Sequence, residues 1–270
     1  MTEIVSLETL AGEVRPGQSL AIPVTGVSMA ATAALIEAGV RDLKVICVPI
    51  SSIQADLLIG AGIVSEIETS AVSLGEAGGA PRFNAAVRAG SFALRDSTCP
   101  AILAGLLAAQ KGVPFMPIAG IVGSDLLQVR PDWKLIDSPV GEPGKVVVVP
   151  AIAPDVALFH APEADRAGNI RIGRHRELAA MAYAAKRTFV TVERIVERNL
   201  MSSEESAAGV LPSLYVDKVA AAPRGAWPLP LPGEYPGDDV EVARYAAMAR
   251  SEEGFRAWLS GFLTQRKQVA

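Results

Sequence analysis

Short apolar runs alternate with amphipathic, helix-like segments along residues 17–150. The apolar runs predict strands, and the segments of roughly 10 residues between them predict helices. Strands separated in this way by single helices are typical of βαβ units, whose strands run parallel. We therefore expect an α/β fold with a mostly parallel, open sheet flanked by helices. Its first strands are expected at 20–24, 43–50 and 113–118, with an extended segment at 63–74.

Several helix ends carry local signals. Ser28 suits the N-cap of a helix that ends at Gly39. Pro81 stands at the favoured first position of another helix, and Gly90 ends it. Further helices are expected at 55–61, at 100–111 with Gly112 as its stop, and at 177–186.

The pattern changes at residues 146–172. VVVVPAIAPDVALF, at 146–159, predicts a nearly continuous strand with proline at its breaks. His160 ends this run, so we expect its ring at a strand edge, away from bulk water. A polar corner at 163–166 and a tight turn at Gly168-Asn169 precede a further strand. His160 is then either a hydrogen-bonded core residue or part of a functional motif.

The last third of the chain predicts strands at 189–196 and 215–221, and an irregular surface segment rich in Pro and Gly at 222–237. Ser251 followed by two glutamates begins a C-terminal helix. Its apolar stripe has the spacing of one buried face: Phe255, Trp258, Leu259, Phe262 and Leu263. No repeat and no clear linker interrupt the chain, so we expect a single domain over residues 1–270.

Composition narrows the class of protein. Half of the 270 residues are hydrophobic and the formal charge is −4, with no basic block that could neutralise nucleic-acid phosphates or dock on a membrane. No run of about 18 uncharged apolar residues is present. Glu3 and Glu8 stand where a secretory signal needs basic and apolar residues. Cys47 and Cys99 have no metal-ligand spacing, which indicates reduced thiols, a cytoplasmic location and no metal.

Two blocks of sequence carry a resemblance to a known family. The first is PDVALFHAPEADRAGNIRI at 154–172. The second, at 55–126, holds ADLLIGAG, EIETSAVSLGEAGGAPRFNAAVRAG and GVPFMPIAGIVGSDL, and EEGFRAWL follows near the C-terminus. Their order and spacing resemble the A (alpha) subunit of glutaconate CoA-transferase-like enzymes, coenzyme A transferases that act through a covalent glutamyl thioester.

The resemblance implies an enzyme that moves CoA between carboxylic acids of the glutaconate or 3-oxoacid kind. It implies that the chain has a partner, the B (beta) subunit, in an α2β2 heterotetramer. Acyl-CoA and carboxylate are then the substrates, with the coenzyme A thioester as a substrate rather than a tightly bound cofactor. Nucleic acid and membranes are not expected as partners.

Transfer of this kind needs a carboxylate nucleophile, donors for an oxyanion and an acyl pocket. In the family, the nucleophilic Glu lies on the B subunit within a Glu-Asn-Gly-like motif. Glu68, Glu76 and Glu163 are the nearest candidates here, and none precedes Asn-Gly. We therefore expect no catalytic residue in this chain and assign the nucleophile to the partner.

Three loops that follow expected strands are candidates for substrate binding, or are plain turns: 25–28, 73–79 and 120–125. The carboxyl ends of parallel strands meet at one edge of a sheet, so we expect the loops to converge there. The family usually has a richer glycine loop after its first strand, whereas this chain has only Gly26. Ser73 is the preferred donor. The candidates are Thr25, Gly26, Val27, Ser28, Ser73, Gly75, Glu76, Gly120 and Ser124.

Other members of this scaffold are decarboxylases and ring-cleaving CoA-thioester hydrolases. The resemblance places an acidic residue of the hydrolases near position 99, where this chain has Cys99 followed by Pro100. This difference favours the transferase, and we expect Cys99 to be a buried thiol. A non-catalytic ligand-sensing module, as in regulators of sugar metabolism, is a different class. It would need a helix-turn-helix, and the segment before Val14 is too short to hold one.

Overall fold

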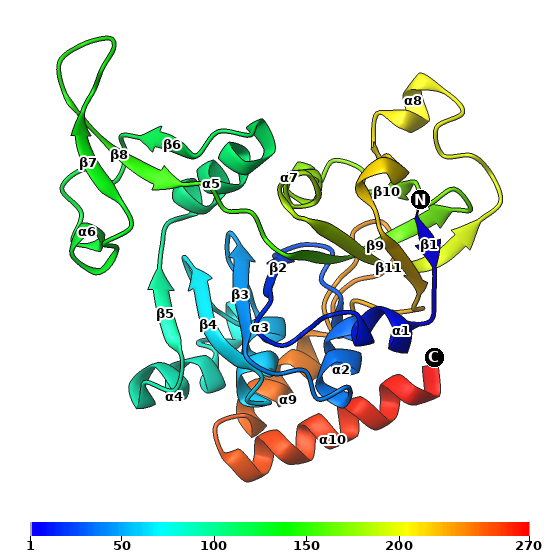
Figure 1. The fold of residues 1–270 in the computed structure, drawn as a ribbon. Coiled ribbons are helices and arrows are strands. Elements are labelled where there is room, and N and C mark those ends of the chain that lie inside the picture. The colour runs from blue at the N-terminus through cyan, green and yellow to red at the C-terminus, as the bar shows by residue number, and fades with distance from the viewer. Residues whose placement is uncertain (1, 270) are drawn as a thin grey trace.

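The computed structural model describes residues 2–269, and a parallel sheet forms its centre (Figure 1). The strands of its main path follow the order β1-β13-β11-β9-β2-β3-β4-β5, and all neighbours on this path are parallel. Their bounds are Glu3–Ile4, Lys218–Ala221, Arg187–Val196, Val156–Asp165, Ser19–Pro23, Leu43–Val48, Val64–Thr69 and Ala93–Asp96, in that order. The expected α/β fold with a mostly parallel sheet is confirmed.

A hairpin extends this sheet. The short strands β10 (Ile170–Arg171) and β12 (Val210–Leu211) pair antiparallel, and β10 also pairs antiparallel with β9. Gly168 lies in the turn between β9 and β10 with a φ of 88°, as the tight reversal expected at Gly168-Asn169 requires. The predicted strand-turn-strand is therefore confirmed, although β9 runs on to Asp165.

The chain reverses its direction across the sheet between β2 and β9. From β2 it proceeds through β3 and β4 to the edge at β5, and it later returns to β9 on the other side of β2. The β2–β9 pairing is short, because only Leu20 and Ala21 have partners in β9, whereas β9 stays paired with β11 to its end. This topological switch point is the place where open α/β sheets bind ligands.

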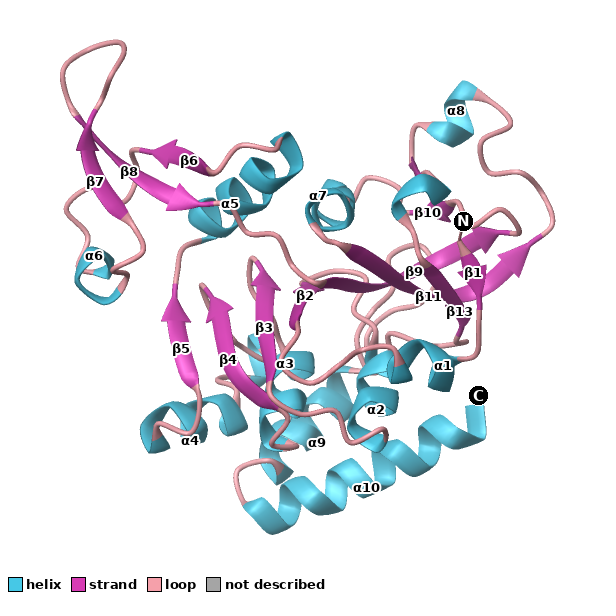
Figure 2. Cartoon of the chain, in the orientation of Figure 1, coloured by secondary structure: helices cyan, strands magenta, loops and turns pink. Residues whose placement is uncertain are grey.

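Helices cover both faces of the sheet (Figure 2). Helices α5 (Cys99–Lys111) and α7 (Arg176–Ala184) lie on one face. The other face carries α1 (Leu7–Gly12), α2 (Met29–Glu37), α3 (Ile53–Gly60), α9 (Asp239–Met248) and α10 (Glu252–Val269). Alternate strand residues enter the two cores: Leu20 and Val45 one, Ala21 and Ile46 the other. This alternation follows from the period of two in a strand.

The local signals for helix ends are confirmed. Ser28 is the N-cap of α2, and its Oγ accepts the Ala31 N–H at 3.3 Å. Pro81 begins α4 (Pro81–Ala89), and Gly90 ends it in the left-handed conformation. The stripe on α10 is also confirmed, because Phe255, Trp258 and Phe262 are buried and Leu259 and Leu263 are partly buried.

A second, antiparallel sheet lies beyond α5 (Figure 1, upper left). It holds β6 (Phe115–Ile118), β8 (Lys145–Pro150) and β7 (Lys134–Asp137), in the order β6-β8-β7. Two expectations were wrong here. The strand expected at 113–118 is not part of the parallel sheet. The run at 146–159 is not one strand, because residues 151–155, flanked and interrupted by prolines that cannot donate to a ladder, separate β8 from β9.

An ion cluster joins this small sheet to the ends of β4 and β5. The buried Arg130 guanidinium lies 2.8 Å from the Glu68 carboxylate and 3.0 Å from that of Asp132, and it donates to the Asp96 carbonyl oxygen at 2.9 Å. The Arg130 guanidinium also stacks on Trp133, 4.3 Å from the ring centroid.

The remaining short elements are η1 (Gly75–Ala77), α6 (Leu126–Val129), α8 (Glu204–Ala207) and η2 (Ser213–Tyr215).

The expectation that Cys99 is buried was wrong. Cys99 is the first residue of α5, after the N-cap Thr98, and it is exposed. Its Sγ lies 3.1 Å from the Ser70 Oγ. Cys47 is the buried thiol, and burial raises its pKa to about 12.

Within residues 2–269, no helix combines the length and the apolar character needed to cross a membrane. A single domain over 1–270 remains a prediction.

Candidate functional site

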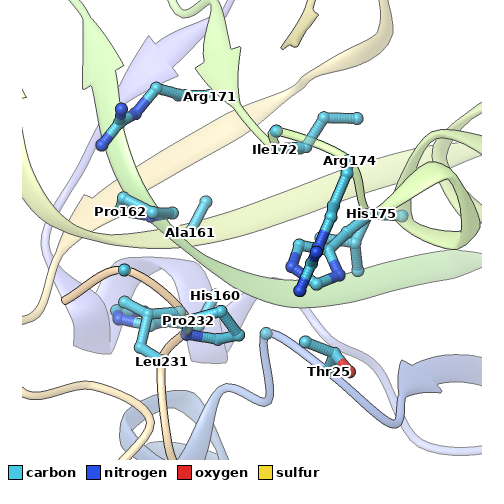
Figure 3. A pocket seen from close by; sticks show the side chains of 14 residues that line it. Thr25, His160, Ala161, Pro162, Arg171, Ile172, Arg174, His175, Leu231 and Pro232 are labelled. Atoms are coloured by element: carbon cyan, nitrogen blue, oxygen red, sulfur yellow. The ribbon is translucent and has the colours of Figure 1, made fainter. Parts of the chain in front are cut away.

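A pocket of about 360 Å³ lies at the switch point, where β2 ends and β9 continues past it (Figure 3). Four segments line the pocket. They are Thr25 and Gly26 after β2, residues 160–162 of β9, residues 171–175 together with Leu178 of α7, and residues 231–233. Two of the predicted site residues, Thr25 and Gly26, therefore lie at this pocket.

Gly26 allows the loop after β2 to contact the backbone of β9. Its φ is 70°, and a Cβ at this position would lie 2.6 Å from the His160 carbonyl oxygen. In return, the His160 N–H donates to the Gly26 carbonyl oxygen at 2.6 Å. Only glycine fits both the left-handed conformation and this separation. The single glycine of this loop is thus sufficient for a close backbone approach.

His160 is the hydrogen-bonded core histidine that was one of its two expected roles. Its side chain is fully buried, with Nε2 2.7 Å from Glu193 Oε1 and Nδ1 2.8 Å from Thr191 Oγ1. Thr191 Oγ1 in turn lies 2.6 Å from Ser28 Oγ. Gly225 packs on the ring so closely that a Cβ there would meet its Cε1 at 2.4 Å.

The protons of this network can be assigned. Burial raises the pKa of Glu193, but hydrogen bonds from His160, Tyr235 and the Arg224 amide outweigh it and lower this pKa to about 2. An ionised carboxylate only accepts, so His160 Nε2–H donates to it. Nδ1 then accepts from the Thr191 hydroxyl. Burial lowers the pKa of His160, so the ring is neutral at physiological pH.

The network fixes one wall of the pocket. It connects the loop after β2, through Ser28, with β9, β11 and the segment that carries Tyr235, whose hydroxyl donates to Glu193 at 2.7 Å. Both nitrogens of His160 are occupied within the network. His160 therefore positions the pocket backbone and has no free nitrogen with which to exchange a proton with a ligand.

This network predicts a pH dependence of folding. The unfolded chain can protonate His160 near its ordinary pKa of 6.5, whereas the folded pKa is lowered. The unfolded state thus binds more protons below pH 6.5, and the free energy of unfolding should fall as the pH drops, by at most about 1.4 kcal/mol per pH unit. The pKa of Glu193 is lowered from 4.5 to about 2, so the loss of stability continues as the pH falls through this lower range. Urea unfolding between about pH 7 and about pH 5 measures the His160 effect.

His160→Gln is the matched variant, because its amide can meet both Thr191 and Glu193 but does not titrate. We expect a flatter dependence in this variant over the same range. His175→Gln serves as the control, since His175 is partly exposed and lies outside the network. Equal slopes in the wild-type chain and His160→Gln would contradict the assignment of a neutral buried ring.

The other predicted loops do not line this pocket. Ser73 is exposed, and its Oγ accepts the Gly75 N–H at 3.2 Å and donates to the Gly78 carbonyl oxygen at 3.4 Å, so it holds its own turn. Ser124 accepts the Leu126 N–H at 3.2 Å ahead of α6. The expected convergence of three loops was wrong, because the loop at 120–125 follows β6 of the antiparallel sheet.

Substrate binding remains a prediction for all nine candidates. Val27 and Ser28 are buried behind the pocket, and Glu76, Gly75 and Gly120 are exposed outside it. Sequence reasoning missed Arg174 and His175, although the three arginines and one histidine of the segment RIGRHRE, at the start of an expected helix, could have marked them. In residues 2–269, no group of three or more His, Cys, Asp or Glu could hold a metal ion.

Comparison with known proteins gives a consistent result. The coenzyme A transferase family model matches residues 5–222. The A subunit of 3-oxoadipate CoA-transferase from Pseudomonas knackmussii is 31% identical over 249 residues, which cover 89% of this chain and 85% of the relative. The cholesterol ring-cleaving hydrolase IpdA subunit of Rhodococcus jostii is 32% identical over 276 residues, covering 96% and 91%.

Among solved structures, the glutaconate coenzyme A-transferase of Acidaminococcus fermentans matches with a TM-score of 0.87 and 27% identity, over 98% of this chain and 89% of the other. The expected resemblance to the A subunits of glutaconate CoA-transferase-like enzymes is confirmed. The family model spans most of the chain, and the alignments with relatives extend almost from end to end. The chain therefore belongs to the coenzyme A transferase family.

Proposed function

We propose that this chain is the A subunit of a heteromeric CoA transferase that moves CoA between carboxylic acids of the glutaconate and 3-oxoadipate kind. The alignment with the A subunit of a 3-oxoadipate CoA-transferase over 89% of the chain carries this proposal. The partner's glutamate attacks the thioester carbonyl and expels CoA thiolate, which gives an acyl anhydride. The thiolate then attacks the glutamyl carbonyl of the anhydride, releases the donor acid as its carboxylate and leaves a glutamyl-CoA thioester. This chain contributes binding surface to the reaction.

The ion pairs of Glu68 and Glu163, two of the three candidate carboxylates, support a nucleophile on the partner, and the third, Glu76, is exposed outside the pocket. Glu68 is held by Arg130 and by Arg95, at 2.8 and 3.3 Å. Glu163 is fully buried and faces three arginines, among them Arg171 at 3.1 Å. A carboxylate engaged in such pairs is a poor nucleophile, because attack would break them in a buried site.

The proposal includes the assembly and its surroundings. A B (beta) subunit completes the enzyme as an α2β2 heterotetramer in the cytoplasm, and acyl-CoA and a free carboxylic acid are its substrates. Coenzyme A enters and leaves as a thioester, with no tightly bound cofactor.

Reconstitution tests the proposed function. The purified chain should not exchange CoA between acetyl-CoA and glutaconate, because it lacks the nucleophile. Mixing with a B-type subunit from the same organism should produce transfer, measured by following both thioesters by chromatography. Replacing the partner's glutamate in its Glu-Asn-Gly-like motif by alanine should abolish it. Transfer at an enzymatic rate by the chain alone would refute the assignment.

A CoA-thioester hydrolase is the second candidate. The IpdA relative aligns with 96% of the chain, more than the 3-oxoadipate transferase relative does. The two activities differ in their need for an acceptor acid. A transferase passes CoA to the acceptor as a new thioester and releases little free thiol with or without an acceptor, whereas a hydrolase releases free CoA in both cases. Thiol release with and without glutaconate decides between them.

A further inference from the structure

Arg174 is the one strongly basic side chain that extends into the pocket without a partner in the described part of the chain. It lies just before α7, and no ion pair or side-chain hydrogen bond joins it to any of residues 2–269. Figure 3 shows it reaching across the pocket in the direction of Thr25. Arg171, in contrast, points away and is engaged by Glu163 at 3.1 Å and Glu234 at 3.5 Å.

The rest of the lining is largely apolar, with a few polar and basic groups. Leu178, Ile172 and Leu231 are almost fully buried and present hydrocarbon, and two prolines lie beside them. None of the described residues that line the pocket is acidic. The Thr25 hydroxyl adds a donor, and the start of α7 contributes the partial positive charge of a helix N-terminus. The pocket thus combines a cationic group with a hydrocarbon surface.

This combination suits a ligand that carries a carboxylate on a short hydrocarbon chain. A guanidinium pairs with a carboxylate through two parallel hydrogen bonds. Such a guanidinium binds a ligand carboxylate more strongly when no neighbouring carboxylate of the protein competes for it. The apolar residues suit a short methylene chain, and about 360 Å³ is in the range of small-molecule sites. In CoA transfer one carboxyl group reacts, so pairing with Arg174 needs a second carboxylate on the same molecule.

We propose that this pocket binds the acyl chain of a dicarboxylic acid and that Arg174 pairs with the carboxylate that does not react. Thr25 donates a further hydrogen bond to the same carboxylate. This inference rests on the proposed function for the identity of the reacting group. Arg174 acts here as a specificity residue and takes no part in bond making.

Direct binding is the first test, and it needs only the purified chain. Glutarate should bind the chain in calorimetry, and pentanoate, which lacks the second carboxylate, should bind more weakly. Arg174→Gln should weaken the binding of glutarate about tenfold and leave the affinity for pentanoate unchanged. Arg176→Gln is the matched control, because Arg176 is exposed, lies two residues further along and is not part of the lining. Arg174→Lys should recover part of the loss.

Kinetics of the reconstituted complex separate this inference from the proposed function. Arg174→Gln should raise the KM for glutarate as acceptor about tenfold and leave the KM for pentanoate and the kcat unchanged. If the complex transfers no CoA but the chain binds glutarate through Arg174, the pocket stands and the proposed function fails. If the complex transfers CoA and Arg174→Gln changes neither glutarate affinity nor its KM, the pocket assignment is overturned. Unchanged circular dichroism of each variant establishes that it folds.

Discussion

Replacing Gly26 by alanine is expected to lower the free energy of unfolding by about 2–4 kcal/mol. A side chain at a φ of 70° is disfavoured by roughly 1–2 kcal/mol, and its Cβ would also lie 2.6 Å from the His160 carbonyl oxygen. Neither β2 nor β9 can move away easily, because both are buried central strands. Urea unfolding of the two proteins under the same conditions measures the difference.

Gly173→Ala is the matched control for this prediction. Gly173 also lines the pocket and has a positive φ of 59°, but nothing lies within 4 Å of a Cβ there. Gly173→Ala should therefore lower the free energy of unfolding only by the backbone component, about 1–2 kcal/mol. The gap between the two variants isolates the contact between the loop after β2 and β9. Equal losses would show that the two segments separate without strain, and that the contact does not fix the pocket.

Local chemistry was sufficient for much of the fold. The N-cap at Ser28, the proline at the start of α4 and the glycines that end α4 and α5 act through the nearest turn of backbone, so the sequence determined them directly. The stripe of α10 and the hairpin turn at Gly168 also depend on spacing within a few residues.

Strand partnership could not be read in the same way. Residues 115–118 and 145–150 have the same apolar character as the strands of the parallel sheet, yet they pair with each other. The choice of partner depends on contacts far apart in sequence. Strands β5 and β7 were missed because they are short and mostly exposed and carry charged residues, so they show no buried alternation.

The pocket likewise has one part that the sequence located and one part that only tertiary packing brings together. The switch-point argument located the loop after β2, because it needs only the order of strands and the position of Gly26. The opposite wall comes from β9, the start of α7 and residues 231–233, which converge only through tertiary packing. Cys99 illustrates the limit of residue type as a guide: cysteines are usually buried, but the first residue of α5 lies at an exposed helix start.

Replacing Arg130 by alanine should destabilise the attachment of the small sheet by about 3 kcal/mol, the lower end of the range for removing one partner of a buried ion pair. Arg130 contacts Glu68, Asp132 and the Asp96 carbonyl oxygen and is 3% exposed. Its loss leaves Glu68, only 7% exposed, with the half-exposed Arg95 as remaining partner. The lower end of the range applies because Arg95 still offsets part of that charge.

Amide hydrogen exchange should locate this effect. Protection should fall in α6 and β7, which lie on either side of Arg130 in the chain, more than in β2 and β3 of the parallel sheet. Lys145→Ala is the control within the same small sheet, since Lys145 pairs with Asp137 on the surface at 2.9 Å and should change stability by less than about 1 kcal/mol. If Arg130→Ala loses no more than Lys145→Ala, the ion cluster does not hold the small sheet. Uniform loss of protection in both sheets would instead mean that the two sheets unfold as one cooperative unit.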